Sequence, residues 1–330
     1  MINQIKRIVI VGLGSIGRRH LRLIKEMRPD IQVILVRSGK GKKWPEEELA
    51  NFVVKSLSEA ISIGVDAAII STPAVFHAEQ SIKFIENEIP TLIEKPLSHT
   101  LGFAKKLNKA WLEKKNLVLL GYTLRHNSAA SFFHRKIQGS EIGDILSVTI
   151  RYESYLPKWR PDQDYRETVS ARKDLGGGVL LELSHEIDYA NWFFGPFKSV
   201  SSMLSNSKTL DIDVEDMADI IFETYDNRPV NIHLDFCSQI SSRFCSVKTN
   251  KGELTWNLLK NNITWIDSEG VSKIWEFDDE RDEMYRNQLN HFFDCIESGC
   301  ESKVTIDDGL TVAKLIDSVK LANSGIDILR

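Results

Sequence analysis

Lys95 and His185 have side chains that can exchange protons, and their positions in the sequence suggest that they take part in catalysis. Lys95 ends a short apolar run and is followed by Pro96, which favours an extended backbone at a strand end. His185 lies three residues after Glu182, so on a helix these two side chains would share one face, and Asp188, three residues further on, could orient the imidazole. A histidine exchanges protons near neutral pH, and a nearby carboxylate fixes its tautomer. These residues predict acid–base chemistry; the alternatives are a surface lysine and a structural histidine satisfied by Asp188.

The element that would bring a reactant to Lys95 is a glycine loop near the start of the chain. An apolar run at residues 7–11 leads into Gly-Leu-Gly-Ser-Ile-Gly at 12–17, and a helical pattern follows. Gly12 permits a tight turn, Gly14 lets a pyrophosphate approach the backbone, and Gly17 lets helix and strand pack closely. The helix N-terminus then offers N–H groups to the phosphates. We therefore predict a dinucleotide site that includes Gly12, Gly14, Ser15, Ile16 and Gly17.

The second predicted strand, residues 32–36, indicates which dinucleotide binds. An acidic residue at its end would accept hydrogen bonds from the ribose 2′-hydroxyl of NAD, but Arg37 and Ser38 stand there, followed by a lysine-rich stretch. A guanidinium and a hydroxyl suit the 2′-phosphate of NADP. NADP is therefore preferred over NAD, with a solvated basic loop as the alternative.

Two further apolar runs, residues 66–70 and 91–93, end in polar residues, and strand ends at one edge of an α/β sheet are where ligands bind. His77, in the helix after the first run, is expected near the nicotinamide riboside, unless it is a solvated or capping histidine. The alternation of strands and helices predicts a doubly wound parallel Rossmann sheet over residues 1–122. The cofactor contacts expected at these strand ends are Ser71, Thr72, Pro73, His77, Glu94 and Lys95.

The pattern of the chain changes after Tyr122. An alternating strand at 144–152 and, from Met217 onward, strand-like runs separated by turn signals predict a large, mostly antiparallel open sheet. Residues 123–330 are thus predicted to form an α+β domain that binds substrate and mediates oligomerisation. An apolar outer face on such a sheet would have to be covered, usually by a partner subunit, so we expect a homo-oligomer, either a dimer or a tetramer.

Length and composition exclude several classes of protein. The 330 residues suit two domains with sizeable cores, and the net charge of −4 offers no positive field to nucleic acid or an anionic membrane. No apolar stretch approaches the ~20 residues that span a bilayer, and the first residues lead into a strand rather than a signal peptide, which predicts a cytoplasmic protein. The four cysteines form no C-x-x-C pair and lack histidines at metal-like spacing, so we expect packing thiols, without zinc or disulfides.

With these motifs in place, the chain resembles the Gfo/Idh/MocA family of oxidoreductases. The resemblance spans nearly the whole chain and rests on the glycine loop, Glu-Lys-Pro at 94–96, and the helix led by three glycines at 176–178 that bears His185. It implies a Rossmann domain, a mixed-sheet substrate domain, and hydride transfer between a nicotinamide cofactor and a sugar-like alcohol or ketone, with Lys95 and His185 as the catalytic pair. The family usually carries an aspartate four residues before this histidine, whereas here Glu182 stands three before it.

The segment at 155–172 looks like a subgroup of that family linked to bacterial surface-sugar and nonulosonic-acid pathways. Its arginines suit a carboxylate or phosphate, and its aromatic rings can stack on a sugar, which predicts an anionic sugar such as a sugar acid, nonulosonic acid or nucleotide sugar. Equally, the segment can be an exposed loop held by salt bridges. The expected substrate-binding residues are Lys95, Tyr122, Arg125, Trp159, Arg160, Tyr165, Arg166, Arg172 and His185.

In the predicted mechanism, His185 accepts the proton of the substrate hydroxyl while Lys95 donates a hydrogen bond to the same oxygen; the opposite assignment of roles stays open. Two other functions remain: an inositol or neutral-sugar dehydrogenase, and a nucleotide-bound regulator without catalysis. A regulator would need only the glycine loop, so the presence of Lys95 and His185 favours an enzyme.

Overall fold

The computed structural model describes residues 4–39 and 41–323 of the chain. Within these ranges, none of the helices has the length and apolar composition needed to cross a membrane.

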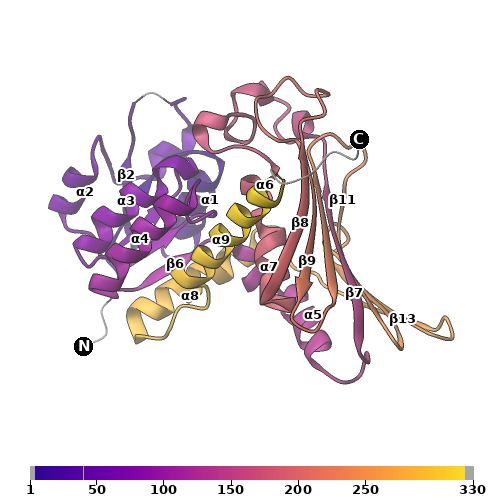
Figure 1. The fold of residues 1–330 in the computed structure, drawn as a ribbon. Helices are drawn as coiled ribbons and strands as arrows, with labels where there is room; N and C mark the ends of the chain where they lie inside the picture. Colours follow the sequence, from indigo (N-terminus) through magenta and orange to yellow (C-terminus); the bar gives the residue numbers. More distant parts are fainter. Residues whose placement is uncertain (1–3, 40, 324–330) are drawn as a thin grey trace. The chain divides into compact units, whose positions relative to one another are not determined.

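The chain folds into two compact units (Figure 1). The first runs as far as Thr123 and also includes Tyr285–Ala313, and the second comprises Leu124–Met284 with the chain from Lys314 onward. Each unit is built on one β-sheet, parallel in the first and mostly antiparallel in the second. The predicted fold class is thereby confirmed.

The sheet of the first unit has six parallel strands in the order β3-β2-β1-β4-β5-β6. Its central strands are continuous apolar runs, and β4 is buried at every position, because helices cover both faces of such a sheet. The strands are β1 Arg7–Val11, β2 Gln32–Val36, β3 Phe52–Val54, β4 Ala67–Ile70, β5 Thr91–Ile93 and β6 Val118–Leu120.

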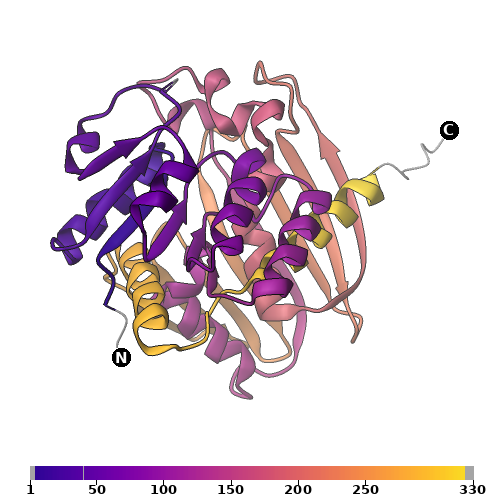
Figure 2. The same cartoon turned by 90° about the vertical axis from the view of Figure 1, so that its left-hand side faces the viewer.

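The helices between these strands begin at local signals in the sequence. Ser56 and Thr100 cap the helices that follow them, each accepting a hydrogen bond from a backbone N–H three residues on. Two of the helices, α3 and α4, pack side by side on one face of the sheet (Figure 2). The helical segments are α1 Ser15–Met27, η1 Pro45–Leu49, α2 Leu57–Ile63, α3 Ala74–Glu86 and α4 Leu101–Lys114.

Residues from late in the sequence complete the first unit. Helix α8 (Glu283–Ser298) contributes Leu289, Phe292 and Phe293, all fully buried, to the core that α1 shares with one face of the parallel sheet. At the edge of that sheet, the N–H of Leu120 donates to the carbonyl of Val304, just before α9 (Ile306–Asn323) begins.

The sheet of the second unit has eight strands in the order β14-β13-β12-β11-β7-β10-β9-β8. Its neighbours are antiparallel except for the parallel pair of β7 and β10. The strands are β7 Ile145–Glu153, β8 Phe197–Ser205, β9 Met217–Thr224, β10 Pro229–Asp235, β11 Ser242–Thr249, β12 Gly252–Asn257, β13 Asn262–Asp267 and β14 Ser272–Glu276.

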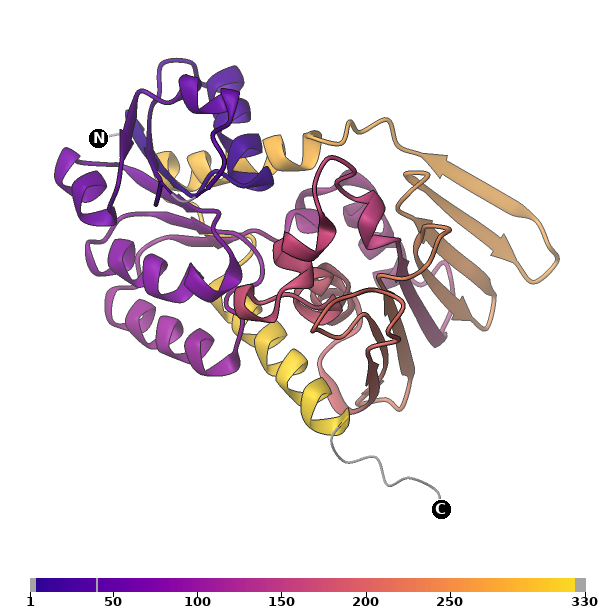
Figure 3. The ribbon, with the colours of Figure 1, turned by 90° about the horizontal axis from the view of Figure 1, so that it is seen from above.

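Helices pack on one face of this sheet (Figure 3), where β7 and β10 present buried residues such as Ile150 and Ile232. On the opposite face polar residues such as Thr149 alternate with exposed apolar ones such as Met203 and Ile221. The homo-oligomer stays a prediction. The helical segments are η2 Thr123–His126, α5 Ser128–Gln138, η3 Leu156–Lys158, η4 Tyr165–Glu167, η5 Val169–Ala171, η6 Lys173–Leu175, α6 Val179–Glu182 and α7 Ser184–Phe194.

Candidate active site

The glycine loop joins β1 to α1, and each of its three glycines is suited to its position for a different physical reason. A Cβ on Gly17 would lie 2.4 Å from the carbonyl oxygen of Gly12, and one on Gly12, whose φ is +92°, would lie 2.9 Å from Thr72 Cγ2. A Cβ on Gly14 would meet nothing within 4 Å. Gly12 and Gly17 therefore let the loop pack, while Gly14 leaves the backbone open to a ligand.

The N-terminus of α1 has the properties of a phosphate site. Gly14 is its N-cap and supplies no side-chain hydrogen bond, the first turn carries no acidic residue, and Gly14 and Ser15 are exposed. The N–H groups of this turn and the positive end of the helix dipole thus suit an anion. Ile16 is half-buried beside them. These residues fit the pyrophosphate of a dinucleotide.

The carboxyl ends of β1, β4 and β5 lie in register: Val11 pairs with Ile70, and Ile70 pairs with Ile93. The residues that follow these strands are therefore neighbours at one edge of the sheet. The hydroxyl of Ser71 ties the edge to the glycine loop, since it donates to the carbonyl oxygens of Val11 (2.9 Å) and Gly12 (3.0 Å). Ser71 thus stabilises the glycine loop and is also a candidate cofactor contact.

His77 holds two of these strand ends together. Its Nδ1 lies 2.8 Å from the carbonyl oxygen of Pro96 and its Nε2 2.7 Å from that of Thr72, whose hydroxyl donates to Gln80. Burial lowers the pKa of His77 more than the two carbonyl groups raise it. His77 is fully buried next to the half-buried Pro73, which gives it a structural part in addition to any contact with a cofactor.

Glu94 and Lys95 follow β5 but differ in their surroundings. The Glu94 carboxylate is buried, 2.7 Å from Nε2 of His20 on α1, and packs against Gly121, where a Cβ would lie 2.9 Å from Glu94 Oε2. Lys95 is half-buried at the sheet edge. Sequence reasoning missed His20, whose only signal was its place one turn after the glycine loop. The buried His20–Glu94 contact fixes α1 to the strand end that carries Lys95.

The basic loop after β2 is held by acidic and aromatic residues. The Arg37 guanidinium binds the carboxylate of Glu47 through Nη1 and the carbonyl oxygen of Lys42 through Nη2, at 2.6 Å. The guanidinium of Arg18 lies 3.8 Å from the centre of the Trp44 ring. Ser38, by contrast, is exposed. The acidic turn of η1, which sequence reasoning did not use, thus partly neutralises this loop.

In the second unit, two of the three glycines before His185, Gly177 and Gly178, pack against protein backbone and side chains. A Cβ on Gly177 would lie 2.5 Å from the carbonyl oxygen of Val169, and one on Gly178 (φ +103°) would lie 2.3 Å from the carboxylate of Glu215. The helix that follows is interrupted at Leu183, between α6 and α7. His185 and Glu182 are half-buried on either side of this interruption, rather than on one continuous helix.

Asp188 and Arg125 form a buried bidentate ion pair. Arg125 Nε donates to Asp188 Oδ2 at 3.1 Å and Nη2 donates to Oδ1 at 2.7 Å. The two side chains are 7% and 0% exposed, respectively. The pair joins α7, which carries His185, to η2, which directly follows the fully buried Tyr122.

The sequence did not predict a second ion pair, which joins Glu186 on α7 to Arg243 on β11. Arg243 Nε donates to Glu186 Oε1 at 2.7 Å, and its guanidinium lies 4.4 Å from the centre of the Tyr152 ring. The indole of Trp159 stacks on Tyr152 at 6.4 Å and donates to the hydroxyl of Ser154 at 2.7 Å. Trp159, Tyr152, Arg243 and Glu186 thus form a continuous stack from the loop after β7 to α7.

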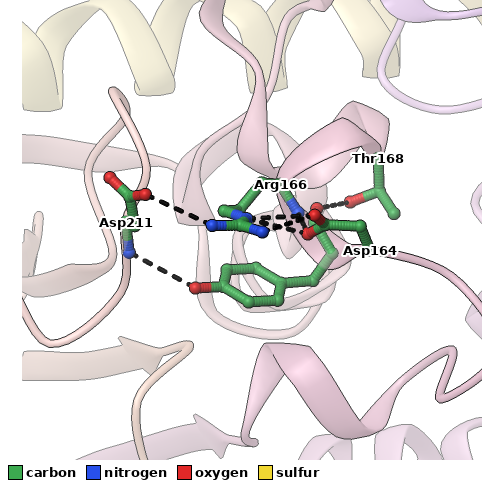
Figure 4. Close-up of polar contacts among 5 residues, drawn as sticks. Asp164, Arg166, Thr168 and Asp211 are labelled. Carbon is green, nitrogen blue, oxygen red and sulfur yellow. Dashed lines mark hydrogen bonds and ion pairs between the residues drawn. The ribbon is translucent and has the colours of Figure 1, made fainter.

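Two of the three arginines of the 155–172 segment, Arg166 and Arg172, have carboxylate partners close in sequence. Arg166 binds Asp164, with Nη2 2.6 Å from Oδ2, and also approaches Asp211, whose N–H donates to the Tyr165 hydroxyl (Figure 4). The hydrogen bonds from Arg166 lower the pKa of Asp164. Arg172 forms a similar bidentate pair with Asp174, and Arg160 is half-buried. An anionic substrate would have to compete with these carboxylates.

Comparison with known proteins adds a family context. The model of the GFO_IDH_MocA oxidoreductase family, NAD-binding Rossmann fold, matches residues 6–122, and that of its C-terminal alpha/beta domain matches residues 134–325.

Individual relatives differ in what they act on. A 4-carboxy-2-hydroxymuconate-6-semialdehyde dehydrogenase of Sphingobium sp. is 30% identical over 47% of this chain and 51% of its own length. The scyllo-inositol 2-dehydrogenase (NAD(+)) of Bacillus subtilis is 24% identical over 91% of this chain and 88% of the relative. Among solved structures, the WlbA dehydrogenase from Bordetella pertussis, in complex with NADH and UDP-GlcNAcA, has a TM-score of 0.79 at 18% identity, covering 99% of this chain and 98% of that one. At this identity the likeness shows a shared fold.

Proposed function

The chain belongs to the Gfo/Idh/MocA family of oxidoreductases, and on that premise we propose that it transfers a hydride between a nicotinamide dinucleotide and a CH–OH carbon of a sugar or sugar derivative. The observation that carries the proposal is the register of β1, β4 and β5, which brings the open glycine loop and the Glu94–Lys95 segment to one edge of the sheet. Lys95 is therefore next to the place where a dinucleotide would lie.

When bound, the nicotinamide ring supplies or accepts the hydride. In the oxidation direction, His185 accepts the proton of the substrate hydroxyl and Lys95 donates a hydrogen bond to the same oxygen. This hydrogen bond stabilises the negative charge that the oxygen gains as the proton leaves, and the charge is lost again when the carbon gives up its hydride and the C=O bond forms. In the reduction direction, His185 returns the proton. Lys95 as the proton-transfer group, with His185 positioning the substrate, is the second possibility, and pH–rate profiles of variants at Lys95 and His185 separate the two.

The surrounding residues support this pair. Asp188, through its bidentate bonds to Arg125, holds α7 and thus His185 in place, and Glu182 lies at the end of α6. In the first unit, the His20–Glu94 contact fixes the helix of the glycine loop against the strand end of Lys95. We propose Asp188 and Glu94 as positioning residues and Glu182 as the acid that favours the protonated form of His185.

We propose NADP as the preferred cofactor, with Arg37 and Ser38 binding the 2′-phosphate. The support is the position of both residues directly after β2 and the absence of an acidic residue there. Arg37 must then exchange its bond to Glu47 for one to the phosphate. A preference for NAD has a physical basis as well, since Glu47 offers a carboxylate to a ribose 2′-hydroxyl.

For the substrate, we propose an anionic sugar that contacts Arg160, Arg166 and Arg172 and stacks on the rings of Trp159 and Tyr165. UDP-GlcNAcA in the WlbA complex supports this class. A neutral polyol is the second candidate, since Arg166 and Arg172 are already paired with Asp164 and Asp174, and since scyllo-inositol is the substrate named for one relative.

The test is a turnover screen that follows NADPH and NADH absorbance with nucleotide sugars, sugar acids, nonulosonic acids and polyols. We expect turnover with an anionic sugar, and loss of that turnover when Arg160 and Arg166 are both replaced by glutamine. Turnover of inositol that is indifferent to the double replacement would identify a neutral-polyol enzyme. Cofactor binding without turnover of any class would point to a nucleotide-bound regulator.

A further inference from the structure

A compact cluster outside the proposed site consists of His291, Cys295 and Cys300, whose candidate ligand atoms all lie within 4.8 Å of one another. His291 and Cys295 are one turn apart on α8, and Cys300 follows Gly299 just after the helix ends. Gly299 has a φ of +75°, a left-handed conformation that returns the chain towards the last turn of the helix. The sequence spacing concealed this proximity, because the turn at Gly299 brings Cys300 back.

The two thiols of the cluster are unusually close. Cys295 Sγ lies 2.6 Å from Cys300 Sγ, so a movement of only about 0.6 Å would reach the ~2.05 Å length of a disulfide bond. Cys295 is buried, and Cys300 is exposed. All four cysteines, including the distant Cys237 and Cys245, are thiols in the structure.

We propose that Cys295 and Cys300 are a thiol oxidation site that closes to a reversible disulfide when the protein meets a hydroperoxide. In the first step, the exposed Cys300 thiolate attacks the peroxide O–O bond and forms a sulfenic acid, and the hydroxide or alkoxide that is released takes up a proton from solvent to become water or an alcohol. In the second step, the Cys295 sulfur attacks the sulfenic sulfur, the S–S bond forms, and the hydroxyl leaves as water with the Cys295 proton. The two sulfurs lose two electrons, which the peroxide takes up.

The surroundings of the sulfurs agree with this order of events. Burial and the contact with Cys300 raise the pKa of Cys295 to about 12, so Cys295 is a thiol until its partner has been oxidised. His291 is beside it, with Nε2 3.6 Å from Cys295 Sγ, and burial lowers the pKa of His291. Cys300 is therefore the residue that is oxidised first, and Cys295 then attacks its sulfenic acid.

A bound soft metal is the competing use of the same residues, and the hydrogen bonding of His291 favours it less. Nε2 of His291 already accepts the backbone N–H of Lys303 at 2.9 Å. A metal bound through this nitrogen would have to displace that hydrogen bond.

The disulfide would cross-link a part of the first unit that contacts both helix α1 and strand β6. Two residues after Cys295, Glu297 forms a bidentate pair with Arg28 at the end of α1, at 3.0 and 3.2 Å. Four residues after Cys300, the Val304 carbonyl accepts the N–H of Leu120 at the end of β6. We therefore expect the oxidised chain to resist local unfolding of α8 more strongly than the reduced chain.

The experiment oxidises the full chain with a few equivalents of hydrogen peroxide, alkylates the remaining thiols, and maps the peptides by mass spectrometry. We expect a Cys295–Cys300 linkage that dithiothreitol reverses, absent in Cys300→Ser and retained in the control variant Cys237→Ser. Slower hydrogen exchange in the last turn of α8 should accompany the linkage.

Two results would overturn the proposal. One is irreversible oxygen addition at Cys300 without the linkage. The other is stoichiometric binding of Zn²⁺, or of Co²⁺ with thiolate charge-transfer absorption, that protects both thiols from the peroxide. The mapping on the unaltered chain decides between these outcomes even if a variant does not fold.

Discussion

Replacing Asp188 with alanine is expected to destabilise the second unit strongly, because the Arg125 guanidinium would stay buried without that carboxylate. The two hydrogen bonds that are lost, at 3.1 and 2.7 Å, both join charged groups. Such bonds contribute roughly 1.5–3 kcal/mol each, and breaking a buried ion pair by removing one partner costs about 3–5 kcal/mol. We therefore expect a loss of about 3–5 kcal/mol in the free energy of unfolding of this unit.

The measurement is urea unfolding at pH 7 together with native-state hydrogen exchange of the α7 amides, which reports on the second unit directly. Asp174→Ala is a matched control: Arg172 binds Asp174 in the same bidentate manner, at 2.9 and 2.5 Å, but these side chains are 46% and 62% exposed. Solvent screens an exposed pair, so the control should leave the urea midpoint within experimental scatter.

A double variant separates the burial of a charge from the loss of packing. Removing both charges, in Arg125→Leu with Asp188→Leu, should recover most of the stability lost in Asp188→Ala, because no unpaired charge is left buried. The reasoning would be refuted if Asp188→Ala and Asp174→Ala had equally small effects, or if the losses of the two single changes at Arg125 and Asp188 simply added.

Lys95→Met and His185→Ala should each lower kcat by about 10²–10⁴ while the cofactor dissociation constant stays the same, and a pH–rate profile of each variant identifies the proton-transfer group by the limb that disappears; near-normal turnover in both would exclude the proposed pair. Arg37→Ala should weaken NADP binding by roughly 10–100-fold and NAD binding much less, as measured by fluorescence titration, because one charged contact to the 2′-phosphate is lost; equal effects on both nucleotides would argue against the NADP preference. His77 has a lowered pKa in the folded chain, so as pH falls below ~6.5 the unfolded chain binds a proton that the folded chain does not, and stability should decrease by up to about 1.4 kcal/mol per pH unit. The urea midpoints at pH 7.5 and 5.5 should therefore differ more in the wild type than in His77→Gln. If the midpoint changed equally with pH in both proteins, His77 would not contribute to the pH dependence of stability.

Both sheets could be predicted because the sequence patterns that indicate them lie close together in the chain. The glycine loop directly follows an apolar run, and the turn signals after Met217 separate runs of strand length, so neither inference required a distant contact. The strand ends at Ser71 and Lys95 were predictable for the same reason. Parallel pairing then brings those ends together by topology alone.

The side-chain partners in and around the candidate site were not predictable, since each depends on residues far apart in sequence. Glu94 contacts His20 across 74 positions, Arg125 binds Asp188 across 63, and Arg243 binds Glu186 across 57. Such pairs leave no periodic pattern, and a buried acid looks the same in sequence as an exposed one. A local spacing rule also fails for Cys295 and Cys300, whose proximity depends on the backbone conformation of Gly299.

The place of α8 in the first unit has a consequence for how the chain is made. During synthesis, the six strands of the parallel sheet emerge from the ribosome early. Phe292 and Phe293, which complete one side of the core of this sheet, emerge only after the whole antiparallel sheet has been synthesised. Domains usually fold in the order in which they leave the ribosome. Here the second unit can finish first, while the nucleotide-binding unit waits with part of its core exposed, which makes the nascent first half a natural client for chaperones that bind apolar surface.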